Sequence, residues 1–161
     1  MTVSLEELGE ALKRAFLEVF GESLVSLVLF GSYARGDYSV DSDVDVLVVL
    51  ESVGDRFELH RKLDAVEEAL EPIFRRLRER GYNPRLSPYV LSREQASQTR
   101  PLYLDMVFDC RILYDKDGFM SKIVERVKRR LEEYGAERVY IGRRYVVVLK
   151  RDYRFGDVIE I

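Results

Sequence analysis

Apolar residues near the N-terminus recur every three or four positions and predict an amphipathic helix over residues 4–20. The start of this helix carries a capping-box pattern, in which Ser4 is followed three positions later by Glu7. Residues 56–80 repeat the helical period over a longer and more highly charged stretch, with Pro72 as a kink or a break. Two long helices are therefore expected, one at the N-terminus and one in the middle of the chain.

The apolar runs between these two helices have no helical period and predict strands. Residues 24–30 are apolar and partly β-branched, and they lead into Gly31-Ser32, where a short helix can begin. Residues 43–50 end in an uninterrupted apolar run, which is typical of a central strand that is buried on both faces.

Helices continue to alternate with strands along the rest of the chain. The further elements predicted are a strand over 85–91, a short helix over 101–109, a strand over 112–114, a helix over 118–134, a hairpin over 139–150, and an edge strand or tail over 152–161. This order predicts an α/β (α+β) fold with a small mixed β-sheet flanked by helices. We expect residues 1–100 to form the core and residues 101–161 to form an extension packed on it, not an independent domain.

Composition narrows the classes of function. The 161 residues, 47% of them hydrophobic, suffice for one compact core, and their apolar runs are too short to cross a bilayer, so a cytoplasmic protein without membrane association is expected. A single cysteine, Cys110, excludes an internal disulfide, and a single histidine, His60, leaves no Cys/His zinc site. A net charge of −3 argues against a protein that coats nucleic acid. Arginine far outnumbers lysine, which is compatible with a thermophilic source.

The residues that carry chemistry lie where the second apolar strand begins. Asp43 and Asp45 are two positions apart, so in a strand both side chains project to the same face. The apolar run that follows would hold the two carboxylates on a rigid support. Because Mg²⁺ and similar hard cations take one or two carboxylates together with substrate phosphates, the pair predicts a Mg²⁺ or Mn²⁺ site for a nucleoside triphosphate.

A second anchor for the triphosphate precedes this pair. Gly31 lets the backbone approach a phosphate closely, and Ser32 offers a hydroxyl and free backbone N–H groups at the start of a helix. Ser42 can cap the turn before Asp43 or orient a carboxylate. Asp-x-Asp alone more often marks a solvated strand entrance. The combination of Gly31-Ser32, ten intervening residues and the strand that holds Asp43 and Asp45 is what indicates nucleotide chemistry.

The segment GSYARGDYSVDSDVDVLVVL, from Gly31 to Leu50, resembles the motif of the minimal nucleotidyltransferases in the DNA polymerase β superfamily. The resemblance implies a polymerase-β-like fold, here with a C-terminal helix and hairpin extension. It also implies Mg²⁺ dependence and transfer of a nucleoside monophosphate, often AMP from ATP, to a hydroxyl. Some members are antitoxins that modify a tyrosine of a helical toxin of the HEPN type. By the same resemblance, Gly31 and Ser32 bind phosphate, and Asp43 and Asp45 hold metal.

The sequence departs from the family pattern at the third carboxylate. The family places this acid on a neighbouring strand, where it completes the metal site and can accept the proton of the attacking hydroxyl. The predicted strand over 85–91 contains no acid, so Asp105 and Asp109 are the candidates to replace it. Arg35 and Asp37, which also fall in the motif, are expected to pair with each other in a structural role.

Two classes of function remain. The first is an enzyme that transfers AMP, or another nucleotide, from a nucleoside triphosphate to a hydroxyl of a protein or small molecule. The second is a catalytically weakened nucleotide-binding module that acts on a partner by contact, which the missing third acid supports. A nucleic-acid polymerase would need a basic groove that this acidic chain does not display. The sequence leaves open the acceptor, the base, and whether residues 101–161 form a homodimer or partner surface.

Overall fold

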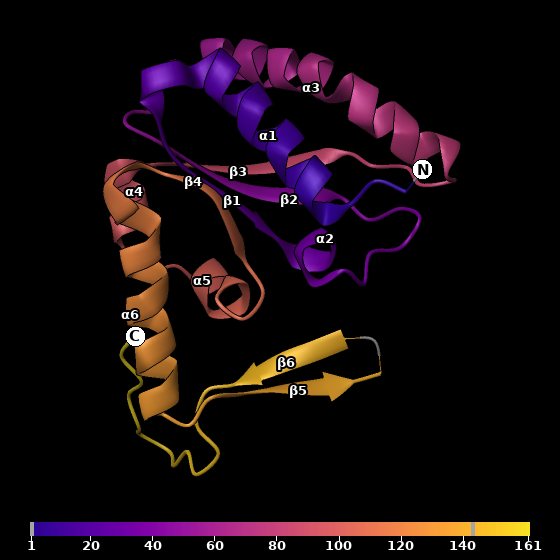
Figure 1. The fold of residues 1–161 in the computed structure, drawn as a ribbon. Coiled ribbons are helices and arrows are strands. Elements are labelled where there is room, and N and C mark those ends of the chain that lie inside the picture. The colour runs from indigo at the N-terminus through magenta and orange to yellow at the C-terminus, as the bar shows by residue number, and fades with distance from the viewer. Residues whose placement is uncertain (1, 143) are drawn as a thin grey trace.

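The computed structural model describes residues 2–142 and 144–161. Its elements are, in chain order, α1 (Leu5–Phe20), η1 (Gly21–Ser23), β1 (Leu24–Phe30), α2 (Gly31–Arg35), β2 (Val44–Leu50), α3 (Arg56–Glu79), β3 (Leu86–Ser92), α4 (Arg93–Ser97), α5 (Pro101–Met106), β4 (Arg111–Asp115), η2 (Lys116–Gly118), α6 (Phe119–Glu133), β5 (Glu137–Ile141) and β6 (Arg144–Val148). Figure 1 shows the helices arranged on both sides of a central sheet, with the β5–β6 hairpin standing apart from it.

The central sheet has four strands in the order β3-β2-β1-β4. Strand β1 pairs antiparallel with β2 and β4, whereas β2 pairs parallel with β3, so the sheet is mixed as predicted. Strand β2 lies inside the sheet, and residues 46–49 are fully buried, which confirms the central strand expected from the apolar run. Because β4 pairs with β1, the sheet includes residues from beyond position 100. The division of the chain into core and extension at that position stays a prediction.

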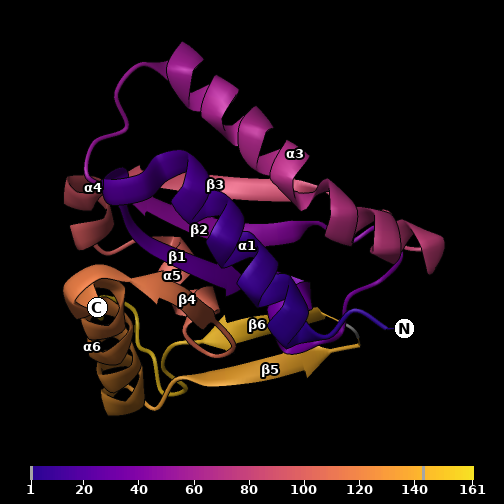
Figure 2. The same cartoon turned by 45° about the horizontal axis from the view of Figure 1, so that its top comes forward.

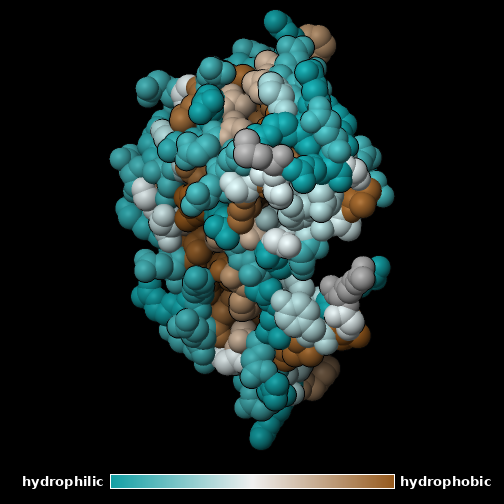
Figure 3. All heavy atoms as spheres, turned by 45° about the vertical axis from the view of Figure 1, so that its right-hand side comes forward, coloured by the Kyte–Doolittle hydropathy of each residue, from teal (hydrophilic) through white to brown (hydrophobic). Residues whose placement is uncertain are grey.

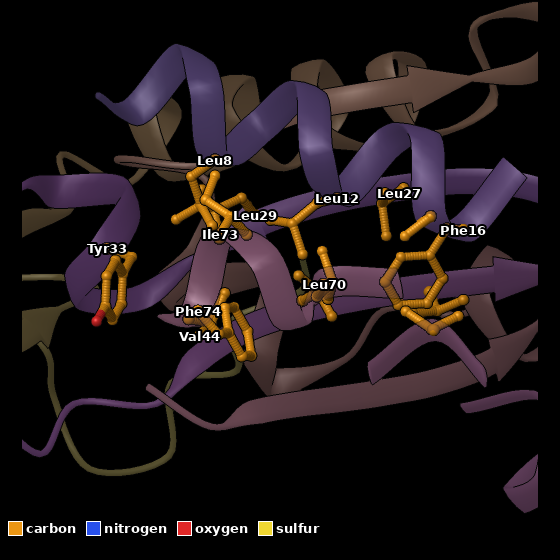
Figure 4. Packing of buried hydrophobic residues seen from close by; sticks show 14 of the residues in the cluster. Leu8, Leu12, Phe16, Leu27, Leu29, Tyr33, Val44, Leu70, Ile73 and Phe74 are labelled. Atoms are coloured by element: carbon orange, nitrogen blue, oxygen red, sulfur yellow. The ribbon is translucent and has the colours of Figure 1, made fainter. Parts of the chain in front are cut away.

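Helices α1 and α3 cover one face of the sheet (Figures 1 and 2). Helix α1 begins with the predicted capping box, in which Ser4 and Glu7 each accept a hydrogen bond from the backbone N–H of the other. Its apolar side packs with that of α3 against β1 and β2, around Leu12, Phe16 and Leu70 (Figure 4). The apolar positions that gave both helices their amphipathic period are therefore the ones that pack in the core shared with the sheet.

Helix α3 runs through Pro72 without interruption, so the alternative that Pro72 breaks it is wrong. Leu70 before the proline, and Ile73, Phe74 and Leu77 after it, are all buried in the same core. Packing on both sides of the proline outweighs the backbone hydrogen bond that a proline cannot donate.

Helices α5 and α6 cover the opposite face of the sheet (Figure 1). Val28 and Leu47 from the sheet pack there with Met106 of α5 and Met120 and Val127 of α6. The loop between β4 and α6 is fixed by Asp115, whose carboxylate accepts hydrogen bonds from Ser26, Met120 and Ser121. Burial raises the pKa of Asp115, but these hydrogen bonds outweigh it and the net pKa is lowered.

The C-terminal half contains one helix that the sequence pattern did not predict and otherwise follows the prediction. Helix α4 was not predicted, although Ser92 and Gln95 form a capping box that the sequence pattern contains. The hairpin predicted over 139–150 is present as β5 and β6, and position 143 in its turn lies outside the described residues. Residues 152–161 form no strand, so the tail alternative is right. Over the described parts of the chain, no helix has both the length and the apolar character needed to span a membrane.

Candidate active site

A pocket of about 450 Å³ opens where β1, α2 and β2 meet the β5–β6 hairpin. Its lining residues come from β1, α2, β2, α5 and β6, and they are Phe30, Gly31, Ser32, Arg35, Asp45, Asp105, Arg144 and Tyr145. Figure 3 shows the surface hollowed between the main body of the molecule and the protruding hairpin. Three of the four predicted site residues, Gly31, Ser32 and Asp45, are thus brought into one pocket.

Asp45 lies on β2 between Phe30 of β1 and Ser87 of β3. Burial raises the pKa of its carboxyl, a hydrogen bond with Ser87 lowers it, and the neighbouring charge of Asp43 raises it further. Arg35 is close enough to lower this pKa through its charge, but the net shift is upward. The site therefore contains a half-buried carboxyl group whose ionised form would be stabilised by another positive charge nearby.

Gly31 is packed directly against Asp45. Its φ angle is +73°, and a Cβ atom at this position would lie 2.4 Å from Asp45 Oδ2. Only glycine combines this backbone conformation with the missing side chain, because other residues rarely adopt a positive φ. The sequence predicts a phosphate contact for Gly31, and the structure adds that Gly31 makes room for the carboxylate of Asp45.

Asp43 comes immediately before β2, which begins at Val44, one residue later than the predicted start of the strand. The backbone there is fixed by a 2.8 Å hydrogen bond from Val44 N to Arg85 O. The Oδ1 atom of Asp43 is buried and lies 3.3 Å from Nε of Arg85, whose own side chain is 69% exposed. The contact has ion-pair distance but not hydrogen-bond geometry, so among the described residues this oxygen accepts no hydrogen bond. Asp43 does not line the pocket, yet its charge acts on Asp45.

The two carboxylates fit a divalent cation that is shared with substrate phosphates. One of them offers a buried oxygen without a hydrogen bond, and the other has a raised pKa. Within residues 2–142 and 144–161, no group of three or more His, Cys, Asp and Glu side chains is placed to hold a metal. This agrees with the absence of an acid on β3.

Arg35 has two partners at the edge of the pocket. Its Nε lies 3.2 Å from Oδ1 of Asp37, so the predicted Arg35–Asp37 pair is present. Its Nη1 also donates to the hydroxyl of Tyr145 at 3.4 Å, and its guanidinium stands 5.3 Å from the centre of the Tyr145 ring. Arg35 therefore connects the motif loop to the hairpin and leaves a positive charge in the pocket.

The two candidate replacement acids lie in different surroundings. Asp105 lines the pocket and accepts a hydrogen bond from Tyr145. Asp109 instead lies 2.7 Å from Nη1 of Arg138, outside the pocket lining. The guanidinium of Arg138 stands 4.8 Å from the ring centres of both Phe108 and Tyr145, so it fastens the hairpin to the rest of the chain. Of the two acids, the geometry favours Asp105.

Several residues near the site were missed or left open by sequence reasoning. Ser42 accepts a 2.8 Å hydrogen bond from the backbone N–H of Ser39, so it closes the turn before Asp43. Ser87 and the hairpin residues Arg144 and Tyr145 were not assigned to the site, and no local motif marks them. Ser87 could have been found from strand register, because it lies on the same predicted strand as the expected third acid.

The tyrosines closest in sequence to the motif form a stack. The rings of Tyr33 and Tyr38 lie parallel at 4.2 Å, and Tyr82 packs against Tyr38 at 5.2 Å. Tyr33 is 2% exposed, and burial raises its pKa to about 12. These side chains support the loop between α2 and β2 and are absent from the pocket lining.

Comparisons with known proteins show the family of this chain. Residues 5–135 match the family model described as nucleotidyltransferase domain. A protein of Methanocaldococcus jannaschii named "Putative protein adenylyltransferase MJ1305" is 35% identical over 112 residues, which cover 68% of this chain and 71% of that protein.

Solved structures give a weaker likeness. A crystal structure of a toxin-antitoxin with AMP-PNP aligns at a TM-score of 0.48 and 17% identity, covering 79% of this chain and 92% of that chain. The structure of a tri-AMPylated Shewanella oneidensis HEPN toxin in complex with MNT antitoxin aligns at a TM-score of 0.45 and 12% identity. The alignment covers 78% of this chain and 87% of that chain. Similarity of this degree is too low to transfer a ligand or a partner.

Proposed function

Since this chain belongs to the nucleotidyltransferase domain family, we propose that it transfers AMP from ATP to a hydroxyl group of an acceptor and releases pyrophosphate. The observation that carries the proposal is the contact between Gly31 and Asp45 inside one pocket. A phosphate-binding glycine and a metal-binding carboxylate must lie side by side if both are to act on one triphosphate, and here a Cβ on Gly31 would meet Oδ2 of Asp45.

Asp43 and Asp45 would hold the divalent cation, and Gly31 and Ser32 would bind the phosphates. A bound Mg²⁺ or Mn²⁺ neutralises charge on the phosphate oxygens. Ser32 offers its hydroxyl, and Arg35 adds a positive charge at the edge of the same pocket. These groups would hold the α-phosphorus in a fixed position, and positioning together with charge stabilisation provides most of the catalysis in phosphoryl transfer.

Asp105 would accept the proton of the attacking hydroxyl. The oxygen of the acceptor forms a bond to the α-phosphorus, the bond from that phosphorus to the bridging oxygen breaks, pyrophosphate leaves, and the hydroxyl proton passes to the Asp105 carboxylate. Its place in the pocket lining supports this role, and the hydrogen bond that it already accepts from a phenol supports it further.

A protein hydroxyl is the acceptor that we propose. The relative with 35% identity is named for protein adenylyl transfer. The motif from Gly31 to Leu50 resembles that of antitoxins which modify a tyrosine of a HEPN-type toxin, so a helical partner of that kind is the acceptor to test first. The pocket opens to the surface beside the hairpin, as a protein acceptor would require.

The test is pyrophosphate release from MgATP in the presence of a HEPN-type protein, with wild type beside Asp105→Asn and Asp109→Asn. Removing a general base typically costs about 10²–10⁴-fold, so we expect kcat for Asp105→Asn to fall at least about 10²-fold. Asp109 lies outside the pocket lining, and an asparagine there can still accept a hydrogen bond from Arg138, so Asp109→Asn should change kcat by less than about 10-fold. A normal rate in Asp105→Asn, or a larger loss in Asp109→Asn, would overturn the assignment of Asp105.

The second candidate function is a nucleotide-binding module that acts on its partner by contact alone. The observation that favours it is the absence, among the described residues, of a three-acid metal cluster. In this case the protein would bind MgATP but would release no pyrophosphate in the presence of any acceptor. Release of pyrophosphate by wild-type protein would exclude it.

A further inference from the structure

Tyr145 stands out among the groups around the pocket because it brings a nucleophile into it. Its hydroxyl donates a hydrogen bond to Oδ1 of Asp105, and both residues line the pocket together with Gly31, Ser32 and Asp45. The phenol and the carboxylate therefore face the space in which the proposed function places the triphosphate. No other step assigned to the site uses this hydroxyl.

The other described tyrosines with assigned contacts are arranged differently. Tyr103 donates to the backbone carbonyl of Ala96 inside the core. Tyr140 and Tyr134 act as acceptors, from Arg138 and from a backbone N–H respectively. Within residues 2–142 and 144–161, Tyr145 is thus the one tyrosine whose hydroxyl donates to a carboxylate.

We propose that the protein adenylylates its own Tyr145, an inference that rests on the proposed function. The Tyr145 oxygen forms a bond to the α-phosphorus of ATP, and the bond from that phosphorus to the bridging oxygen of the β-phosphate breaks. Pyrophosphate leaves, and the phenolic proton passes to the carboxylate of Asp105. One ATP is consumed for each modified chain, and the product is a phosphodiester between Tyr145 and AMP.

The surroundings of Tyr145 hold its ring in place for this reaction. Arg35 and Arg138 stand 5.3 Å and 4.8 Å from its ring centre, and both are anchored by aspartates, Asp37 and Asp109. A nucleophile that is already positioned reacts within one molecule. The reaction therefore avoids much of the translational and rotational entropy loss that a free acceptor would undergo. Burial and the bond to Asp105 raise the pKa of Tyr145 to about 12, so the phenol keeps its proton until it attacks.

Modification would also regulate the site. An AMP group on Tyr145 would occupy the pocket between Asp45 and the hairpin and would block entry of the next ATP. Each chain would then modify itself once, and a modified chain would transfer AMP to other acceptors more slowly than an unmodified one.

The experiment incubates the 161-residue chain with MgATP and no other acceptor, and then measures its intact mass and its tryptic peptides. Trypsin cuts after Arg144 and Lys150 and releases residues 145–150, in which Tyr145 carries the one hydroxyl, whereas Tyr140 falls in the separate peptide 139–143. We expect one added adenylyl group on the peptide 145–150. We also expect a rate per molecule that does not change when the protein is diluted 10-fold.

Tyr145→Phe should lose the adduct and Tyr140→Phe, its neighbour across the hairpin, should retain it. An adduct on any other peptide, a rate per molecule that rises in proportion to protein concentration, or full labelling of Tyr145→Phe would overturn the inference. Calorimetric titration of wild type with MgATP distinguishes a failure of self-modification from a failure of the proposed function. MgATP binding without an adduct would reject self-modification alone, whereas no binding would reject the proposed function as well.

Discussion

Asp45→Asn is expected to weaken Mg²⁺-dependent binding of ATP by at least about 100-fold, or roughly 2.7 kcal/mol. The substitution keeps the size of the side chain but removes the negative charge that would contact the cation beside Gly31. Isothermal titration calorimetry with ATP, in the presence of Mg²⁺ and again with EDTA, measures the effect. In EDTA, wild type and variant should bind ATP equally weakly.

The same substitution should leave thermal stability equal or raise it. The pKa of Asp45 is raised by burial and by the charge of Asp43, so its ionised form is unfavourable in the folded protein without a cation. Sites adapted for function often carry such a cost in stability. Asp41→Asn, which removes the same charge from an exposed position in the neighbouring loop, is the matched control and should retain nucleotide affinity. Equal affinities for Asp45→Asn and wild type would contradict the assignment.

Gly31→Ala is expected to reduce nucleotide affinity at least about 10-fold and to lower the free energy of unfolding by about 1–3 kcal/mol. The new Cβ would lie 2.4 Å from Oδ2 of Asp45, so the carboxylate must move away from its place in the pocket. The positive φ angle at this position adds backbone strain. Calorimetric titration with MgATP and chemical denaturation measure the two effects.

Gly36→Ala separates backbone strain from the collision with Asp45. Gly36 ends α2 with a φ of +84°, and a Cβ there would meet no atom within 4 Å. The strain of a left-handed alanine should cost about 1 kcal/mol of stability, while nucleotide affinity should remain that of wild type. If Gly36→Ala lost as much affinity as Gly31→Ala, a general loss of stability would explain both, and the proposed contact with Asp45 would not be needed.

Strand alternation predicted that Asp43 and Asp45 project to the same face. The structure places Asp45 in the pocket lining and Asp43 directly before β2, outside that lining. The contact of Gly31 with Asp45 was not predicted, although it follows from the chain reversal between β1 and β2. The central position of β2 was predictable, because its apolar run requires burial on both faces.

Residues from the C-terminal half could not be placed in the same way. Asp105 was only one of two candidate acids, because a helical acid has no register with a strand that is distant in sequence. Tyr145 enters the pocket through the docking of β6, and that docking depends on Arg138 stacking against Phe108 and Tyr145. Contacts of this kind depend on the packing of segments that are distant in sequence. The residues around position 145 contain no local pattern that predicts them.

The most direct test of the account is a crystal structure of the protein with Mn²⁺ and a non-hydrolysable ATP analogue, with the metal located by its anomalous scattering. We predict a Mn²⁺ ion in direct coordination with carboxylate oxygens of Asp43 and Asp45, with the triphosphate beside Gly31 and Ser32. A metal bound elsewhere, or a nucleotide bound outside this pocket, would contradict the central claim that these two aspartates bring metal and nucleotide together.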